Sequence, residues 1–500
     1  MGLGLPAPVD LDDLLEPFAS RGVDLGLDRL AGALAAGGHP ERRFAAVQVA
    51  GTNGKGSICT FLAAILAEAG LAYGVYRSPH LLSWCERLQL GERWITAAEL
   101  RADLGRWRPI AEAFNLTPFE LLTAAAFDRL AAEAVQLAIL EVGLGGRLDA
   151  TSLHPARRVI GLAAIGLDHC EYLGSSLEAI AFEKAGAFQP GAIAISAPQD
   201  PAVAAVLTAQ AQRLGTELCW VEPLPPEALG GPRLGLAGDL QRRNGAVAVG
   251  MAQALGKQGW AIGAGAIGRG LARARWPGRL EIRSYRGQPL LLDGAHNPPA
   301  ATALRQELDL GELDLGALER GDLDFGALDR GALERRSLGK GGPGPLDGCG
   351  RRWLLGIQRH KQGAAMLRAL LAPGDQAAIT PLPEHASWSA AELAAACPDL
   401  APQLRQVADP AAGLAWLHQP AGSGPGLDEQ ALSGGSGALV TAVPVVRPIP
   451  LEKALPLDRA VPLEGALPLV TAATLPVIAG SLYLLGALIP LLDPAPAGPG

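Results

Sequence analysis

One short stretch, residues 49–57 with the sequence VAGTNGKGS, limits what this chain can fold into more than any other. It follows an apolar run and precedes a pattern in which apolar residues share one face of a helix. Glycines between a strand and a helix let backbone N–H groups approach phosphate oxygens, and the helix N-terminus adds positive potential. The loop does not match the usual GxxxxGK[ST] spacing. We still predict that it binds the phosphates of a nucleotide through Gly51, Thr52, Asn53, Gly54, Lys55, Gly56 and Ser57.

The length of the chain, its net charge and its cysteines limit the kinds of protein it can be. A chain of 500 residues is too long for one ordinary core, so we expect two domains. The formal net charge of −8 argues against a general nucleic-acid-binding protein, which is usually basic. The six cysteines include no CxxC pair, which is typical of free thiols in a reducing compartment. Residues 1–10 lack the pattern of a secretory signal. We therefore expect a soluble cytoplasmic protein that binds no nucleic acid.

A charge-free apolar run at residues 469–492 is long enough to span a bilayer. Two prolines and two glycines interrupt the run, and no basic cluster flanks it. A buried strand at 475–479, a turn at 480–481 and a helix from Leu482 explain it equally well, because buried parallel strands are continuously apolar. We therefore expect no membrane partner.

Strand and helix patterns alternate along the chain. The first part has expected strands at 44–50, 73–76, 137–142, 159–165 and 192–197, with helical stretches at 11–18, 25–36, 97–134 and 177–185. The second part has expected strands at 290–293, 353–357 and 377–381, with a helix at 364–371. Such alternation predicts α/β domains with mostly parallel sheets, in which ligands gather beyond the carboxyl ends of the strands. We predict a P-loop-type nucleotide-binding domain over residues 1–278 and a smaller Rossmann-like α/β domain over residues 279–500.

Two low-complexity insertions interrupt the predicted second domain. In residues 308–345 leucine recurs every fifth position, a period that matches neither a helix nor a strand. The pattern resembles pentapeptide repeats, but so few repeats make a marginal solenoid, and we expect a disordered or loosely folded surface insertion. Residues 421–468 combine a Gly/Ser-rich linker with prolines at period six, which favours an extended segment.

Three polar residues follow three different expected strands. Ser78, Glu141 and His169 supply one hydroxyl, one carboxylate and one imidazole. Taken singly, each has an ordinary structural explanation: a turn cap, a partner for an arginine and a core histidine. Their shared position at strand ends beside a phosphate loop favours a magnesium site, because Mg²⁺ uses few protein ligands together with water and phosphate oxygens.

Further polar residues extend this predicted site. Lys184 lies near the end of an expected helix, where it is a surface charge, an electrostatic group or, after addition of carbon dioxide, a carbamate. Arg279, Asp293 and His296 come from the second domain, and Asn244 from the end of the first. An arginine can stabilise a transferring phosphoryl group, and a carboxylate can hold a ribose hydroxyl. A site divided between two domains excludes water only when both are docked.

These motifs together resemble those of the folylpolyglutamate synthase/dihydrofolate synthase family, which is part of the Mur-ligase superfamily. The resemblance covers most of the chain outside the low-complexity segments. It is carried by GTNGKGS (51–57), SPHL (78–81), EVGLGGRLDAT (141–151), GLDH (166–169), EKAG (183–186), WPGRLE (276–281), DGAHNP (293–298), HASWS (385–389) and GSLYLLG (480–486).

The resemblance implies an ATP-dependent carboxylate–amine ligase that joins L-glutamate to dihydropteroate, to the glutamate tail of a folate, or to both, through an acyl phosphate. It implies Mg²⁺ as the metal, held by Ser78, Glu141 and His169. It implies ATP as a substrate bound by Lys55, the loop amides, Asn244, Arg279, Asp293 and His296. Lys184 matches a lysine that is carbamylated in the family, and we expect Lys184, His169 and Arg279 to act in catalysis.

Two alternatives stay open. The chain could be a peptidoglycan-precursor Mur ligase, which shares the loop, the lysine and the architecture. It could also be a nucleotide-binding scaffold whose repeats recruit partners. We expect a monomer acting on small molecules; the sequence does not tell which folate reaction is catalysed.

Overall fold

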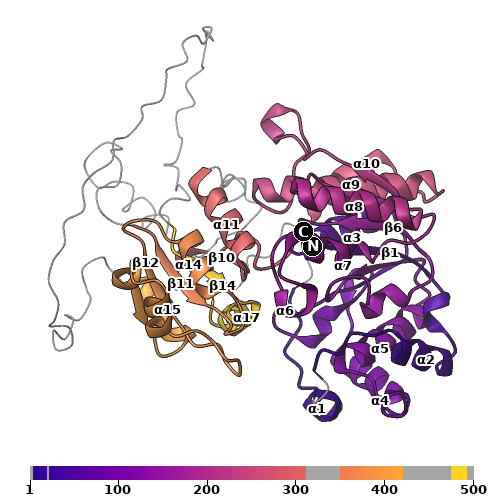
Figure 1. Cartoon of the computed structure of the whole chain (residues 1–500), viewed down its shortest axis with the longest axis horizontal. Helices are drawn as coiled ribbons and strands as arrows, with labels where there is room; N and C mark the ends of the chain where they lie inside the picture. The colour runs from indigo at the N-terminus through magenta and orange to yellow at the C-terminus, as the bar shows by residue number, and fades with distance from the viewer. Residues whose placement is uncertain (1–3, 20–21, 311–349, 420–474, 493–500) are drawn as a thin grey trace, which may run out of the picture.

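The computed structural model describes residues 4–19, 22–310, 350–419 and 475–492. Within these ranges the chain forms two α/β units, each built on its own sheet (Figure 1). The N-terminal unit contains an eight-stranded sheet and the C-terminal unit a six-stranded sheet. The predicted α/β class is therefore confirmed.

The eight-stranded sheet has the strand order β4-β3-β2-β5-β1-β6-β7-β8. Its strands are β1 (Ala45–Ala50), β2 (Tyr73–Tyr76), β3 (Leu88–Leu90), β4 (Arg93–Trp94), β5 (Leu137–Glu141), β6 (Arg157–Leu162), β7 (Ile193–Ser196) and β8 (Glu217–Trp220). The β2–β3 and β3–β4 pairs are antiparallel, and every other pair in this sheet is parallel. Because β1 lies between β5 and β6, the phosphate loop that follows it emerges near the middle of the sheet.

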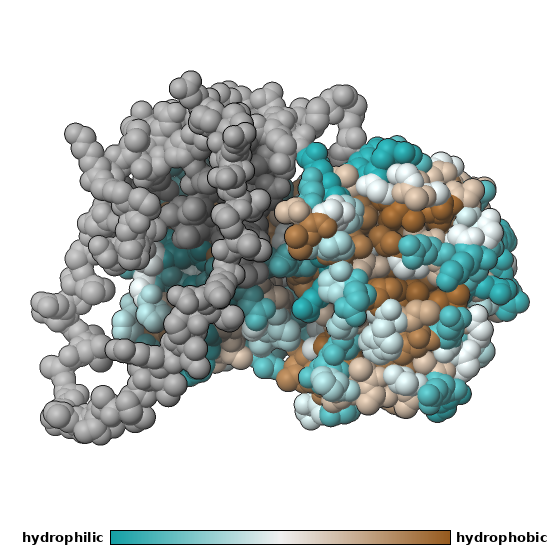
Figure 2. All heavy atoms as spheres, turned by 90° about the horizontal axis from the view of Figure 1, so that it is seen from above, coloured by the Kyte–Doolittle hydropathy of each residue, from teal (hydrophilic) through white to brown (hydrophobic). Residues whose placement is uncertain are grey.

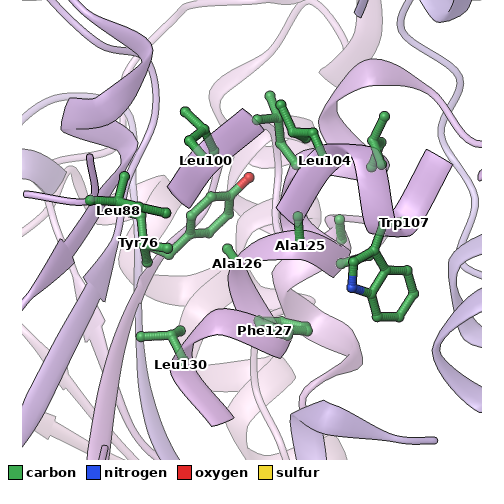
Figure 3. Close-up of a cluster of buried hydrophobic side chains, with 14 of the residues drawn as sticks. Tyr76, Leu88, Leu100, Leu104, Trp107, Ala125, Ala126, Phe127 and Leu130 are labelled. Carbon is green, nitrogen blue, oxygen red and sulfur yellow. The ribbon is translucent and has the colours of Figure 1, made fainter. Parts of the chain in front are cut away.

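Helices cover both faces of this sheet. Val47 and Val49 of β1 pack with one set of helices, whereas Ala46 packs with another, as alternation along a strand requires. Figure 3 shows the second core, in which Tyr76 lies among apolar side chains of α4 and α5. The helices of the unit are α1 (Asp12–Ala19), α2 (Asp28–Ala36), α3 (Lys55–Glu68), α4 (Ala97–Ala113), α5 (Pro118–Ala132), α6 (Cys170–Leu173), α7 (Leu177–Ala185), α8 (Pro201–Leu214), α9 (Asp239–Lys257) and α10 (Ala264–Arg273).

The helical stretch expected at 97–134 divides into α4 and α5. Thr96 and Thr117 each accept a hydrogen bond from the backbone N–H three residues on, and a glutamate at that position caps the threonine in return. Pro118 occupies the first helical position, which proline favours. Because each helix has its own N-terminal cap, the continuous apolar pattern at residues 97–134 forms two helices.

The six-stranded sheet has the order β13-β12-β11-β14-β10-β9 and is parallel except for the β9–β10 pair. Its strands are β9 (Glu281–Tyr285), β10 (Gln288–Asp293), β11 (Arg352–Gly356), β12 (Gln376–Ile379), β13 (Leu404–Gln406) and β14 (Val477–Gly480). Helices α11 (Pro298–Leu310), α14 (Gly363–Leu370), α15 (Ala390–Ala396), α16 (Pro410–Leu417) and α17 (Leu482–Leu488) complete the unit.

The apolar C-terminal run enters this sheet. Strand β14 lies between β11 and β10, and α17 follows after Ser481. A central parallel strand is buried on both faces, which explains its continuous hydrophobicity. None of the described helices is long and apolar enough to cross a membrane.

On the upper surface of the N-terminal unit, hydrophilic and hydrophobic residues are intermixed (Figure 2).

Some sequence expectations fall on other parts of the chain. Both low-complexity insertions lie outside the described residues, except that residues 308–310 form the end of α11. The division at residue 278 stays a prediction. In the structure, α10 ends at Arg273 and β9, the first strand of the second sheet, begins at Glu281.

Candidate functional site

The phosphate loop connects β1 directly to α3. Gly51 has a φ of 138° and Gly54 a φ of 100°, backbone conformations that favour glycine. Both positions are also crowded: a Cβ on Gly51 would lie 2.6 Å from the Cβ of Ala163, and one on Gly54 would lie 2.4 Å from Oδ1 of Asn244. Glycine is therefore required at positions 51 and 54, both because the backbone has a positive φ and because a Cβ would clash with its neighbours. Asn244, from α9, lies against the loop.

Two lysines donate to the carbonyl oxygens of this loop. Lys55 Nζ lies 3.1 Å from the oxygen of Gly51 and 3.2 Å from that of Thr52, and Lys184 Nζ lies 2.8 Å from the oxygen of Gly51. Within the described part of the chain, neither lysine forms an ion pair with a carboxylate. Burial, reinforced by the charge of Lys55, lowers the pKa of Lys184 to about 7. The loop therefore brings together two amines that lack counter-ions.

Ser78 and Glu141 lie side by side at the ends of neighbouring strands. Strands β2 and β5 are parallel partners, and the backbone N–H of Ser78 donates to the carboxylate of Glu141. Burial raises the pKa of Glu141, against the opposing charges of Lys55 and nearby arginines. The Ser78 hydroxyl is fully buried and has no hydrogen-bond partner among the described residues. A buried oxygen without a partner beside a carboxylate fits a hard cation such as Mg²⁺.

His169 begins α6 with a left-handed backbone, φ 51°. Its Nε2 lies 3.8 Å from a carboxylate oxygen of Asp168, and its side chain is 38% exposed. Burial and then the charge of Lys361 lower the pKa of His169 to about 4, which keeps the imidazole in the neutral form that can bind a metal. No hydrogen bond between described residues joins His169 to Ser78 or Glu141. Its donor type fits the ion, and its role as a ligand stays a prediction.

The predicted residues of the C-terminal unit cluster at the end of β10. Asp293 Oδ2 accepts a hydrogen bond from the backbone of Leu280 at 3.0 Å, and burial raises its pKa while Arg279 opposes that rise. The guanidinium of Arg279 packs against Gly294, where a Cβ would lie 2.5 Å from Nη1. Nδ1 of His296 lies 2.8 Å from the carbonyl oxygen of Gly294. These side chains share one strand end, as expected for a ligand site in a parallel sheet.

Three residues that the sequence did not single out join the two units. Lys361 Nζ forms a 2.6 Å ion pair with Oδ1 of Asp168. Asn297 Nδ2 donates to Oδ2 of Asp168 at 2.8 Å, and Asn297 exchanges two 3.0 Å hydrogen bonds with Asn53 of the phosphate loop. Nε2 of His296 lies 3.9 Å from the same carboxylate. Asp168 and Asn297 could have been found within GLDH and DGAHNP, whereas nothing around Lys361 marks it.

The arrangement is suited to polyphosphate chemistry. The loop supplies backbone N–H groups and two amines without counter-ions, and the strand ends of both units turn polar side chains towards the same boundary. A buried carboxylate and an unpartnered hydroxyl supply oxygen ligands for a cation. Clustered positive charge in a water-poor site stabilises the charge of a transferring phosphoryl group.

Comparisons with known proteins give the family. No protein-family model matches this chain. It is 35% identical over 315 residues to the dihydrofolate synthase/folylpolyglutamate synthase of Bacillus subtilis, covering 57% of this chain and 73% of that protein. It is 34% identical over 303 residues to a probable dihydrofolate synthetase of Schizosaccharomyces pombe, covering 56% and 72%.

Solved structures agree in fold. Folylpolyglutamate synthase of Mycobacterium tuberculosis complexed with ADP superposes with a TM-score of 0.71 at 23% identity, covering 96% of this chain and 98% of that one. FolC of E. coli in complex with DHPP and ADP gives a TM-score of 0.70 at 24% identity, covering 96% of each. With the extent of the matches to its sequence relatives, this chain belongs to the dihydrofolate synthase/folylpolyglutamate synthase family.

Proposed function

We propose that this protein is an ATP-dependent ligase that forms an amide between L-glutamate and a carboxylate of dihydropteroate, of the glutamate tail of a folate, or of both. Its curated relatives are dihydrofolate and folylpolyglutamate synthases, and structures of similar fold contain ADP, AMPPNP with Mn, or DHPP. The observation that carries the proposal is the phosphate loop, to whose carbonyl oxygens Lys55 and Lys184 donate, with the buried carboxylate of Glu141 within electrostatic reach of Lys55.

The chemistry follows from the weakness of a carboxylate as an electrophile. Transfer of the γ-phosphoryl group of ATP to the carboxylate gives an acyl phosphate and ADP. The amino group of L-glutamate attacks the acyl carbon, phosphate leaves, and the amine loses a proton as the amide forms. Because the acyl phosphate is hydrolysable, both units must exclude water while it exists.

In this proposal the loop amides and Lys55 hold the phosphates of ATP, and Arg279 stabilises the transferring phosphoryl group. Asn244, Asp293 and His296 contact the rest of the nucleotide. Ser78, Glu141 and His169 would hold magnesium, which when bound neutralises charge on the phosphates. The chain itself orients the reacting groups, which supplies a large part of the rate enhancement.

Lys184 has a separate role. A neutral amine can add carbon dioxide, losing one proton to become a carbamate, and the pKa of Lys184 near 7 makes the neutral amine accessible at physiological pH. The product would carry a negative charge beside the phosphate loop. We propose that this carbamate takes part in the site.

ADP release tests the function. Purified full-length protein would be given ATP, Mg²⁺ and L-glutamate, with dihydropteroate or tetrahydrofolate added separately. We expect release with at least one acceptor, and the acceptors used assign the branch. Release only with a UDP-sugar peptide would move the protein to the cell-wall ligases. No acceptor-dependent release would contradict the ligase and favour a scaffold, which deletion of residues 308–340 would test through loss of partner binding.

The state of the protein in the cell is a further part of the proposal. We propose a cytoplasmic monomer that acts on small molecules. Light scattering after size-exclusion chromatography and cell fractionation test these two statements; a stable dimer or a membrane-bound fraction would contradict them.

A further inference from the structure

A cavity of about 80 Å³ lies in the N-terminal unit behind α3. Alanines of α3, the aromatic residues Tyr73, Trp94 and Trp276, and the buried Arg77 line it. None of these residues is part of the proposed nucleotide or metal site. A water molecule needs about 10–15 Å³ of such volume, so the cavity has room for a ligand of a few heavy atoms.

Arg77 lines this cavity, and one of its buried donors has no partner. Its side chain is 2% exposed, and its guanidinium lies 4.4 Å from the ring centre of Trp276 and 5.5 Å from that of Trp94. Nη2 donates to Oε1 of Gln89 at 3.0 Å, but the buried Nε has no hydrogen-bond partner. Among the described residues, no carboxylate lies within 4.0 Å of this guanidinium. Indole faces offset part of the cost of burying a cation, but an unpaired buried donor still requires a partner.

Tyr73 supplies a second donor to the same cavity. Nε2 of Gln89 donates to the Tyr73 hydroxyl at 3.3 Å, and the described residues offer no acceptor for the hydroxyl proton. Burial raises the pKa of Tyr73 to about 12, so the phenol keeps that proton. Because one glutamine holds both Arg77 and Tyr73, the two donors are fixed relative to each other.

The remaining charges around the cavity are already used. Arg273 pairs with Glu68 and Glu92, and Arg275 donates to backbone carbonyls. The charge of Glu92 at the cavity wall is balanced by Arg273, so the charge left to be neutralised is that of Arg77, which one carboxylate matches. The methyl groups of Ala63 and Ala67 offer an apolar wall for a short hydrocarbon chain.

We propose that this cavity is a binding site for a small monocarboxylate, whose oxygens accept from Arg77 and Tyr73 and whose carbon chain packs on the alanines of α3. A carboxylate matches both the charge of the guanidinium and the two donor positions. Arg77 precedes Ser78 and its charge acts on Glu141, but binding of a monocarboxylate in the cavity is measured without nucleotide and so separately from ligase activity.

Ligand-observed NMR on the full-length protein without nucleotide tests the proposal. Saturation-transfer signals of propionate are recorded against concentration, and inorganic phosphate serves as a second probe. We expect saturable propionate binding that weakens at least tenfold in Arg77→Gln and less in Tyr73→Phe. Arg405→Gln is the matched control, because Arg405 also lies over an indole, 5.4 Å from the ring of Trp416, but in the other unit. It should leave binding unchanged.

A second measurement covers the case in which Arg77→Gln does not fold. Crystals of the unaltered protein soaked in 3-bromopropionate should give an anomalous bromine signal in the cavity. Absence of saturable binding in solution would overturn the proposal, because the donors would then be satisfied by water. Binding at crystal concentration only, tighter binding of phosphate than of propionate, or propionate binding unaffected by both substitutions would also overturn it.

Discussion

Two buried lysines, one from each unit, lie at the same boundary and are held in different ways. Lys184 of the N-terminal unit is 4% exposed and donates to a backbone carbonyl. Lys361 of the C-terminal unit is 7% exposed and forms an ion pair with Asp168. The pKa of Lys184 falls to about 7 because burial is not offset by a carboxylate at contact distance.

The difference separates two uses of a buried cation. A lysine whose charge is already neutralised by a partner ties two pieces of structure together, and removing the partner leaves a costly unpaired charge. A lysine that donates only to a carbonyl keeps its capacity for a ligand or for chemical modification. Lys55 resembles Lys184 because it also donates to backbone carbonyl oxygens. Substitutions should therefore act on stability at Lys361 and on activity at Lys55 and Lys184.

The largest expected effect is that of Asp168→Asn. It leaves the ammonium of Lys361 buried without a counter-ion, so we expect the free energy of unfolding to fall by about 3–5 kcal/mol. Adding Lys361→Met should recover most of this loss, because the double variant has no unpaired charge. Urea unfolding of the single and double variants measures both values.

A control for this pair is Arg108→Met, which removes an exposed ion pair with Glu112 and should cost less than about 1 kcal/mol. If Asp168→Asn costs no more than this control, Lys361 and Asp168 do not join the units, and the contrast with Lys184 disappears.

Lys55→Met should have the next largest effect, on activity rather than stability. Loss of the charge that we propose contacts the phosphates should lower kcat/KM by about 10²–10³-fold, the usual cost of removing one electrostatic contact to a transition state. The free energy of unfolding should fall less than in Asp168→Asn, since Lys55 forms no ion pair at contact distance among the described residues, although its charge favours the ionised form of buried Glu141. Lys257→Met, at the exposed end of α9, is the control. Equal activity of both variants would show that the loop does not hold phosphates through Lys55.

The sequence predicted the N-terminal part of the site better than the boundary between the units. The strand, the glycines and Lys55 are consecutive, so their geometry is local and can be derived from turn and helix chemistry. The contact of Asn53 with Asn297 depends on how two units dock, 244 residues apart. The local sequence around Lys361 has no periodicity or motif that could indicate its partner.

In the fold, too, some features were predicted from the sequence and others were not. The central strand β14 was predicted from its apolar run, because burial on both faces leaves a direct mark in composition. The division between α4 and α5 was not predicted, since the apolar pattern continues across Thr117 and only the capping geometry separates the helices. Local patterns therefore gave the elements, and the contacts between elements came from the structure.

Lys184 gives the third prediction. Its folded pKa of about 7 lies below the ordinary value of 10.5, so the folded state binds fewer protons between these values and stability should rise with pH in that window. The neutral fraction also rises with pH through 7, and with it carbamate formation. NMR with ¹³C-bicarbonate should show a carbamate signal that Lys184→Arg abolishes, together with a 10–100-fold loss of activity. An unchanged signal in this variant would place any carbamate elsewhere.

The smallest effect expected at neutral pH concerns His154, a buried base that, like Lys184, has no carboxylate partner among the described residues. Its ring lies 5.0 Å from that of Phe44, and burial and then Arg157 lower its pKa to about 4. The folded state therefore binds fewer protons than the unfolded state between pH 6.5 and 4, and stability is lost as the pH falls through that window, by at most about 1.4 kcal/mol per pH unit. His154→Gln keeps a donor and an acceptor but cannot titrate. Urea unfolding at several pH values should show that the free energy of unfolding of this variant falls less steeply than that of the unaltered protein below pH 6.5, with no difference in slope above pH 7. Parallel plots of this free energy against pH would mean that His154 is charged in the folded protein. Burial without a carboxylate partner would then not suffice to keep this base neutral.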